Sequence, residues 1–119
     1  MKNLTMALIA VTFIMASALS NANIDIENKQ SSKTANQFCS KNDECVDVVA
    51  MELDALYYQG LNEPRNTSIG TLINRKEKYY IDYCKHSKEK LKYSCESYKN
   101  QLMLKYITGL LDRWKYWKL

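Results

Sequence analysis

The chain has 119 residues, four of them cysteines, with 17 lysines and arginines against 13 aspartates and glutamates. This length supports one domain, and a formal charge of +4 is too small an excess for a nucleic-acid-binding surface. Length and charge therefore exclude a multidomain architecture and argue against nucleic acid as a partner.

The first segment is a nearly unbroken apolar run from Leu4 to Leu19 that follows a weakly basic start. Ser20-Asn21-Ala22 then fits the small-x-small rule for signal-peptide cleavage. Residues 1–22 are predicted to be a signal peptide cleaved after Ala22, which makes the mature protein secreted or periplasmic. A retained anchor is the alternative, because roughly 17 apolar residues can span a bilayer.

Residues 23–37 are polar and contain few side chains to bury, so they are predicted to form a flexible arm. The remaining residues, 38–119, are predicted to form a disulfide-stabilised helical domain. Within it Asn42 or Asp43 is a good N-cap, apolar residues recur at helical spacing, and Gly60 is placed to end the helix. The first helix is therefore expected from about Asp43 to Gln59.

A loop containing Pro64 follows, and Thr67 or Ser68 caps a second helical stretch whose apolar spacing continues to the C-terminus. A single helix of that length would extend about 75 Å, which is too long for a compact domain of this size. We therefore expect a break between His86 and Ser94. The predicted fold class is all-α, a helical hairpin or three-helix bundle.

The four cysteines, Cys39, Cys45, Cys84 and Cys95, predict two disulfides in an exported chain. Antiparallel helices keep the sum of paired residue numbers nearly constant, which favours the nested bridges Cys45–Cys84 and Cys39–Cys95. The alternative is local pairing, Cys39–Cys45 and Cys84–Cys95, which requires a turn between the last two cysteines. The cysteine spacing does not match a structural zinc site, and no metal is expected.

The sequence contains few candidates for catalytic residues. His86 is the only histidine, and it lies in a lysine-rich stretch. The three glycines are isolated, so no phosphate-binding loop is present. The sequence predicts a non-enzymatic protein without a cofactor.

Nine tyrosines are the one compositional excess, and they interleave with lysines after Gly60. Rigid aromatic rings beside basic groups favour recognition of another protein, although a bundle short of aliphatic residues also uses rings as core. The predicted binding surface contains Tyr79, Tyr83, Tyr93, Lys99, Trp114, Tyr116 and Trp117. Contact of the last three with a membrane surface is a weaker alternative.

Two local resemblances involve the cysteines. The segment Cys39-Ser40-Lys41-Asn42-Asp43-Glu44-Cys45 resembles a cysteine loop in the lysis-inhibition antiholins of T-even-like phages, small periplasmic proteins that bind a holin. Cys84 and Cys95 have no counterpart there. The gaps of thirty-eight and ten residues around Cys84 are similar to part of the insect odorant-binding pattern, whose first and last cysteines this chain lacks.

The predicted function is a small secreted binding protein, such as an inhibitor, an immunity-type factor or a venom or salivary component, acting through its Tyr- and Lys-rich helical surface on a protein partner. One alternative is a periplasmic accessory protein of a bacterial or phage envelope system, in conjugation or lysis control. Another is a membrane-active cationic helix. Asn66-Thr67-Ser68 is a glycosylation sequon if the source is eukaryotic.

Overall fold

The structure is a computed structural model that describes residues 24–40 and 42–118, with side chains up to Arg113. Within these residues the backbone is helical over residues 24–39 and in α2 (Asp43–Leu61), α3 (Ile69–Tyr80) and α4 (Glu89–Lys118). The all-α fold class is confirmed. The predicted signal peptide, residues 1–22, lies outside the described residues.

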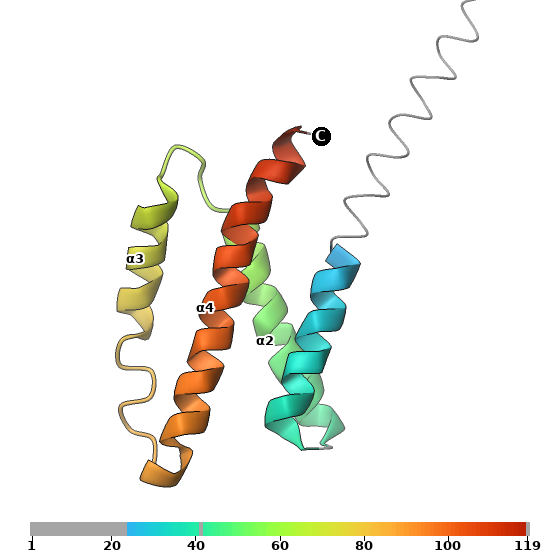
Figure 1. The fold of residues 1–119 in the computed structure, drawn as a ribbon, viewed down its shortest axis with the longest axis vertical. Helices are drawn as coiled ribbons and strands as arrows, with labels where there is room; N and C mark the ends of the chain where they lie inside the picture. Colours follow the sequence, from blue (N-terminus) through green and yellow to red (C-terminus); the bar gives the residue numbers. More distant parts are fainter. Residues whose placement is uncertain (1–23, 41, 119) are drawn as a thin grey trace, which may run out of the picture.

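The helices α2 and α4 form the centre of the molecule, with α3 on one side of α4 and the helix of residues 24–39 on the other (Figure 1). The interface of α2 with α4 is far more extensive than that of α3 with α4. The buried side chains of α2, α3 and α4 form one core cluster: Leu53, Leu56, Leu72, Tyr80, Leu102, Tyr106 and Leu110. Burial of this apolar surface is what holds the helices together.

Glycines permit an unusually close crossing of α2 and α4. A Cβ atom added to Gly60 would lie against the carbonyl oxygen of Tyr106 and 2.8 Å from the amide nitrogen of Leu110. A Cβ on Gly109 would likewise lie against the carbonyl oxygen of Tyr57. The two backbones therefore touch where both helices carry a residue without a side chain.

Side-chain caps fix where α2 and α3 begin. The Asn42 side chain accepts a hydrogen bond from the amide of Cys45 at 3.1 Å, and the Ser68 hydroxyl accepts one from the amide of Thr71 at 3.2 Å. Both caps agree with the sequence analysis. The second break differs slightly, because the chain leaves α3 after Tyr80 and turns through residues 81–88, earlier than the expected window.

The helix of residues 24–39 replaces the predicted flexible arm. Its buried side chains include Ser31, Thr34 and Ala35, which are small enough to let the helix backbone approach its neighbours. The Lys105 ammonium donates to the Glu27 carboxylate at 2.7 Å and to the Glu27 carbonyl oxygen at 3.0 Å, which ties this helix to α4. The prediction failed because the buried stripe is small and polar and therefore carries no hydrophobic signal.

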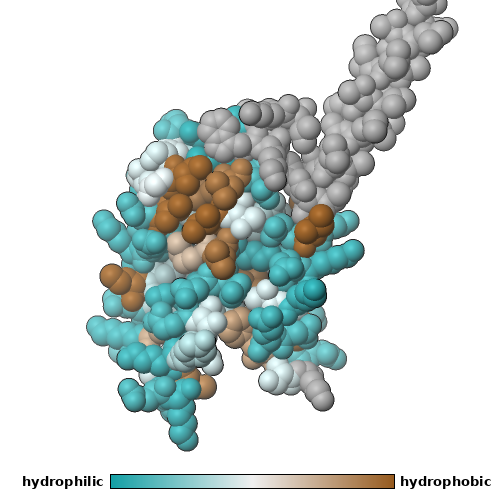
Figure 2. All heavy atoms as spheres, viewed as in Figure 1, coloured by the Kyte–Doolittle hydropathy of each residue, from teal (hydrophilic) through white to brown (hydrophobic). Residues whose placement is uncertain are grey.

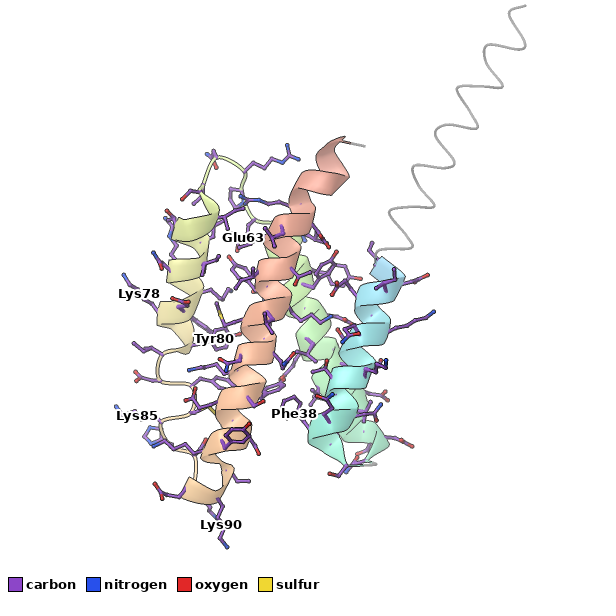
Figure 3. All side chains as sticks on the ribbon, viewed as in Figure 1. Phe38, Glu63, Lys78, Tyr80, Lys85 and Lys90 are labelled. Carbon is purple, nitrogen blue, oxygen red and sulfur yellow. A yellow bond between two sulfur atoms is a disulfide. The ribbon has the colours of Figure 1, made fainter. Side chains whose placement is uncertain are left out.

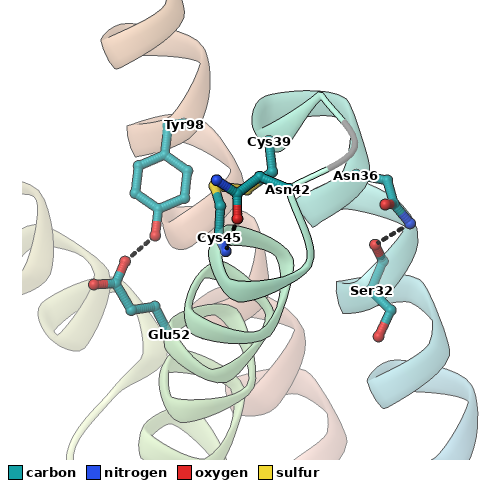
Figure 4. Close-up of a disulfide and its surroundings, with 7 residues drawn as sticks. All are labelled: Ser32, Asn36, Cys39, Asn42, Cys45, Glu52 and Tyr98. Carbon is teal, nitrogen blue, oxygen red and sulfur yellow. Dashed lines mark hydrogen bonds between the residues drawn. A yellow bond between two sulfur atoms is a disulfide. The ribbon is translucent and has the colours of Figure 1, made fainter.

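The two predicted disulfides are present, but the favoured nested pairing is wrong. The bridges are local, Cys39–Cys45 and Cys84–Cys95, with Cα–Cα separations of 5.5 and 5.8 Å. The first joins the helix of residues 24–39 to the start of α2, beside the Asn42 cap (Figure 4). The second is possible because the turn at residues 81–88 brings Cys84 back to α4, whereas a continuous helix would hold the two cysteines about 16 Å apart.

Candidate functional site

A row of aromatic rings crosses the molecule from the end of α3 to α4 and the helix of residues 24–39. The ring centroids of Tyr79 and Tyr80 lie 5.0 Å apart and those of Tyr80 and Tyr83 lie 5.5 Å apart, both in edge-to-face contact. Tyr83 and Tyr98 follow at 6.4 Å, and Tyr98 meets Phe38 at 5.4 Å. Edge-to-face contacts hold each ring in a fixed orientation.

A carboxylate stands beside this row. The hydroxyl of Tyr98 donates a hydrogen bond to Oε2 of Glu52, from α4 to α2 (Figure 4). Burial, and then the hydrogen bond and negative charge of Glu52, raise the pKa of Tyr98 well above its ordinary value. Burial and Glu52 also raise the pKa of Tyr83, so the phenols stay neutral next to a charged carboxylate.

Lys76 lies on the same surface, next to this row of rings. The Lys76 ammonium lies 4.7 Å from the ring centroid of Tyr106 and 5.7 Å from that of Tyr79. It also donates a hydrogen bond to Gln59 Oε1 at 2.8 Å, which links α3 to α2. Burial, followed by the hydrogen bond and the charge of Glu63, raises the pKa of Tyr106 to about 12.

Together these residues line a groove between α2 and α3, floored by α4, which we call the aromatic groove. Its two hollows, of about 270 and 220 Å³, share Tyr79 in their walls. The larger is lined by Glu52, Ala55, Leu56, Tyr79, Tyr80, Tyr83 and Leu102. The smaller is lined by Glu63, Leu72, Arg75, Lys76, Tyr79 and Tyr106.

The structure brings together only part of the predicted binding surface. Tyr79, 78 % exposed, and Tyr83, 45 % exposed, both line the aromatic groove. Tyr93 is exposed near the start of α4, and Lys99 pairs with Glu96 at 2.7 Å beside a different hollow, between α3 and α4. The side chains of Trp114, Tyr116 and Trp117 lie outside the described part of the chain.

Most residues that line the groove were absent from the predicted surface, Glu52 and Tyr80 among them. Tyr80 is buried, yet one side of its ring still faces the groove. Glu52 is an exposed residue of α2. Its proximity to Tyr98 depends on how α2 packs against α4, which residue spacing within either helix does not reveal.

A second exposed surface runs along α4. Leu104, Ile107 and Leu111 recur at steps of three and four and therefore share one side of the helix. Leu104 and Leu111 are both more than half exposed. Figure 2 shows an apolar patch over the C-terminal half of α4 and its border with α3. We call Leu104, Ile107 and Leu111 the α4 stripe.

Basic side chains lie mainly on the outer side of the molecule. Figure 3 shows Lys78, Lys85 and Lys90 extending outward from α3, from the turn and from the start of α4. None of them lines the aromatic groove. The predicted combination of tyrosines with lysines therefore holds for Lys76 in the groove, whereas these other lysines face solvent.

The sequon residue Asn66 is exposed in the loop between α2 and α3. Arg113 holds this loop by donating hydrogen bonds to the carbonyl oxygens of Pro64 at 2.9 Å and Thr67 at 3.3 Å. Asn66 therefore projects from a fixed loop.

The cysteines and the single histidine occupy well-defined places in the fold. All four cysteines are in disulfides, and His86 is exposed in the turn after α3. Among the side chains described, no group of three or more His, Cys, Asp or Glu is positioned to hold a metal ion. Over the same part of the chain, no helix has the length and apolar character needed to cross a bilayer.

Comparison with known proteins gives one match. A family model described as the valyl-tRNA ligase modifier family matches residues 1–112. No curated protein and no solved structure gives a significant match.

Proposed function

The chain belongs to the valyl-tRNA ligase modifier family, and from this premise we propose that it is a non-catalytic protein that binds a valyl-tRNA ligase and modifies it by docking. The family match supports a protein partner of this kind. The structure supports docking because it presents a concave aromatic groove, whereas its cysteines are consumed in bridges.

The aromatic groove is the single observation that favours a docking surface. Tyrosine is enriched among the residues that contribute most to protein interfaces, whereas leucine is under-represented there. Tyr79 and Tyr83 project exposed ring surface from fixed positions, so little side-chain entropy is lost on binding. On these grounds we assign ligase binding to the groove and not to the α4 stripe.

The test is titration of purified valyl-tRNA ligase with the oxidised protein, followed by calorimetry. The double variant Tyr79→Ala/Tyr83→Ala should weaken binding by at least about tenfold, as expected for truncated interface aromatics. Leu104→Ala/Leu111→Ala, which truncates the α4 stripe, is the matched control and should leave the affinity within about twofold. A ligase for another amino acid should not bind.

Two results would refute this assignment. Absence of a complex with the ligase at high micromolar concentration would remove the proposed partner. Loss of binding in the α4 stripe variant, with the groove variant unaffected, would move the docking surface to the other side of α4. Circular dichroism of both variants checks that neither result reflects unfolding.

The two disulfides favour a second candidate, an exported binding protein with a different protein partner. Disulfides persist in oxidising compartments, and export through residues 1–22 remains a prediction from the sequence. Cell fractionation combined with intact-mass analysis tests it directly. Recovery of a chain lacking residues 1–22 outside the cytoplasm would favour this candidate, whereas a full-length cytoplasmic chain would exclude it.

A further inference from the structure

The larger hollow of the aromatic groove combines π faces with one carboxylate. Tyr79, Tyr80 and Tyr83 form its walls, and the buried side chains of Leu56 and Leu102 contribute to its apolar lining. Successive rings meet at interplanar angles of 86° and 71°, so ring faces and edges alternate around the hollow. Ring faces carry negative electrostatic potential, which attracts cations.

Among the described side chains, no lysine or arginine forms an ion pair with the carboxylate in this hollow. Glu52 accepts a hydrogen bond from Tyr98, which makes Tyr98 a positioning residue for the carboxylate. The ion pairs among the described side chains join Lys99 to Glu96 and Lys105 to Glu27, and neither involves Glu52. No lysine or arginine lines the larger hollow.

The smaller hollow shows that this surface accommodates a cation. There Lys76 places its ammonium over the rings of Tyr106 and Tyr79, both within the roughly 6 Å range of a cation–π contact. Tyr79 belongs to both hollows. The larger hollow thus offers similar chemistry, with three rings and the Glu52 carboxylate, but without a lysine or arginine of its own.

We propose that the larger hollow binds the guanidinium group of an arginine side chain from the protein partner. A guanidinium is planar, stacks on aromatic faces and can donate two parallel hydrogen bonds to a carboxylate, whereas an ammonium is a compact, strongly hydrated charge. Tyr79, Tyr80 and Tyr83 supply the faces, and Glu52 supplies the carboxylate. Only the source of the arginine rests on the proposed function.

The direct test uses ethylguanidinium as the probe and no ligase. Aromatic-region NMR of the oxidised protein should show saturable shifts of the Tyr79, Tyr80 and Tyr83 ring signals. Ethylurea, similar in shape and uncharged, should produce none, and ethylammonium should bind several-fold more weakly. Equal responses to ethylurea and ethylguanidinium, or no saturable shift at these rings, would overturn the site.

Variants then separate the carboxylate from the rings. Glu52→Gln should reduce probe affinity by at least about tenfold, since an ionic hydrogen-bond acceptor becomes neutral. Glu44→Gln is the matched control, because Glu44 is an exposed acid in the first turn of the same helix and outside the hollow. If Glu52→Gln does not fold, Tyr83→Leu, which keeps apolar bulk but removes a π face, replaces it with the same expectation.

The same variants tested against valyl-tRNA ligase separate this inference from the proposed function. Weaker ligase binding by Glu52→Gln, with Glu44→Gln unchanged, supports an arginine from the partner. A ligase complex unaffected by Glu52→Gln would overturn the binding of a ligase arginine in this hollow while leaving the proposed function in place. Probe binding without any ligase complex would support the guanidinium site and refute that partner.

Discussion

At Gly109 the backbone of α4 lies against the backbone of α2, and a single added carbon tests that contact. In Gly109→Ala the new Cβ would meet the Tyr57 carbonyl oxygen and come within 3.0 Å of the Leu61 amide nitrogen. We expect a loss of about 2 to 3 kcal/mol in the free energy of unfolding from overpacking, despite the better helix propensity of alanine. Urea denaturation measures it.

Gly70 provides the control for this substitution, because nothing lies within 4 Å of a Cβ placed there. Gly70→Ala, within α3, should raise the free energy of unfolding by about 0.5 to 1 kcal/mol through helix propensity and a less flexible unfolded chain. Equal effects of the two substitutions would show that the close crossing of α2 and α4 is absent in solution.

Tyr106 predicts a specific pH dependence. Its pKa is raised to about 12 in the folded chain, against about 10 for an unperturbed tyrosine, because burial and the bond to Glu63 favour the neutral phenol. A raised pKa means that this stabilisation is complete below about pH 10 and is lost as pH rises toward 12. Tyr106→Phe should flatten the fall in unfolding free energy over that interval, measured by urea titrations at stepped pH.

The sequence predicted the role of an individual residue correctly where that role depends on neighbours a few positions away in the chain. Asn42 and Ser68 cap helices as expected, because a cap bonds to an amide three residues ahead. Gly60 was expected to end its helix. Instead it lies one residue inside α2 and serves the crossing with α4, a role set by a residue far away in sequence.

Each of the two disulfides constrains one connection between neighbouring elements of the chain. Each bridge closes a short loop, of sequence separation 6 for Cys39–Cys45 and 11 for Cys84–Cys95. The chain-entropy relation gives about 2 and about 3 kcal/mol for loops of this size. Replacing Cys84 and Cys95 together by serine should therefore destabilise the protein more than replacing the other pair, as measured by urea denaturation.

Peptide mapping without reduction gives an independent check of the connectivity. Local bridges would leave residues 39–45 and residues 84–95 in separate disulfide-linked fragments. A fragment joining Cys45 to Cys84 would restore the nested hairpin. The sequence argument chose that hairpin because it assumed one register along two helices, whereas the turn at residues 81–88 gives the last two cysteines a closer partner.

The aromatic groove also contains residues that the sequence could not identify without knowledge of how the helices pack. Tyr79 and Tyr83 were predicted from composition and spacing, and both lie in the groove. Tyr93 is also an exposed tyrosine, but it lies outside the groove, because it follows the turn and lies near the start of α4. Glu52 joins the groove only through the packing of α2 on α4, so residue type alone gave no reason to choose it.

For the molecule as a whole, a largely buried ion pair between Glu27 and Lys105 helps to hold the helix of residues 24–39 on α4. Glu27→Gln would leave the Lys105 ammonium, 8 % exposed, without its carboxylate. We expect a loss of about 3 kcal/mol, since an unpaired buried charge is costly. Glu96→Gln, which breaks the more exposed pair with Lys99, should cost less than about 1 kcal/mol. Thermal and urea denaturation compare the two, and similar losses would mean that the helix does not pack on α4.

The glycine crossing also determines which parts of the molecule can move. Where backbone touches backbone, α2 and α4 have no layer of side chains across which to slide, so they should move as one body. By contrast, α3 contacts α4 sparsely, and the Cys84–Cys95 bridge tethers the turn that follows it. Amide hydrogen exchange should be fastest in α3 and slowest around Gly60 and Gly109, and swinging of α3 would change the width of the aromatic groove.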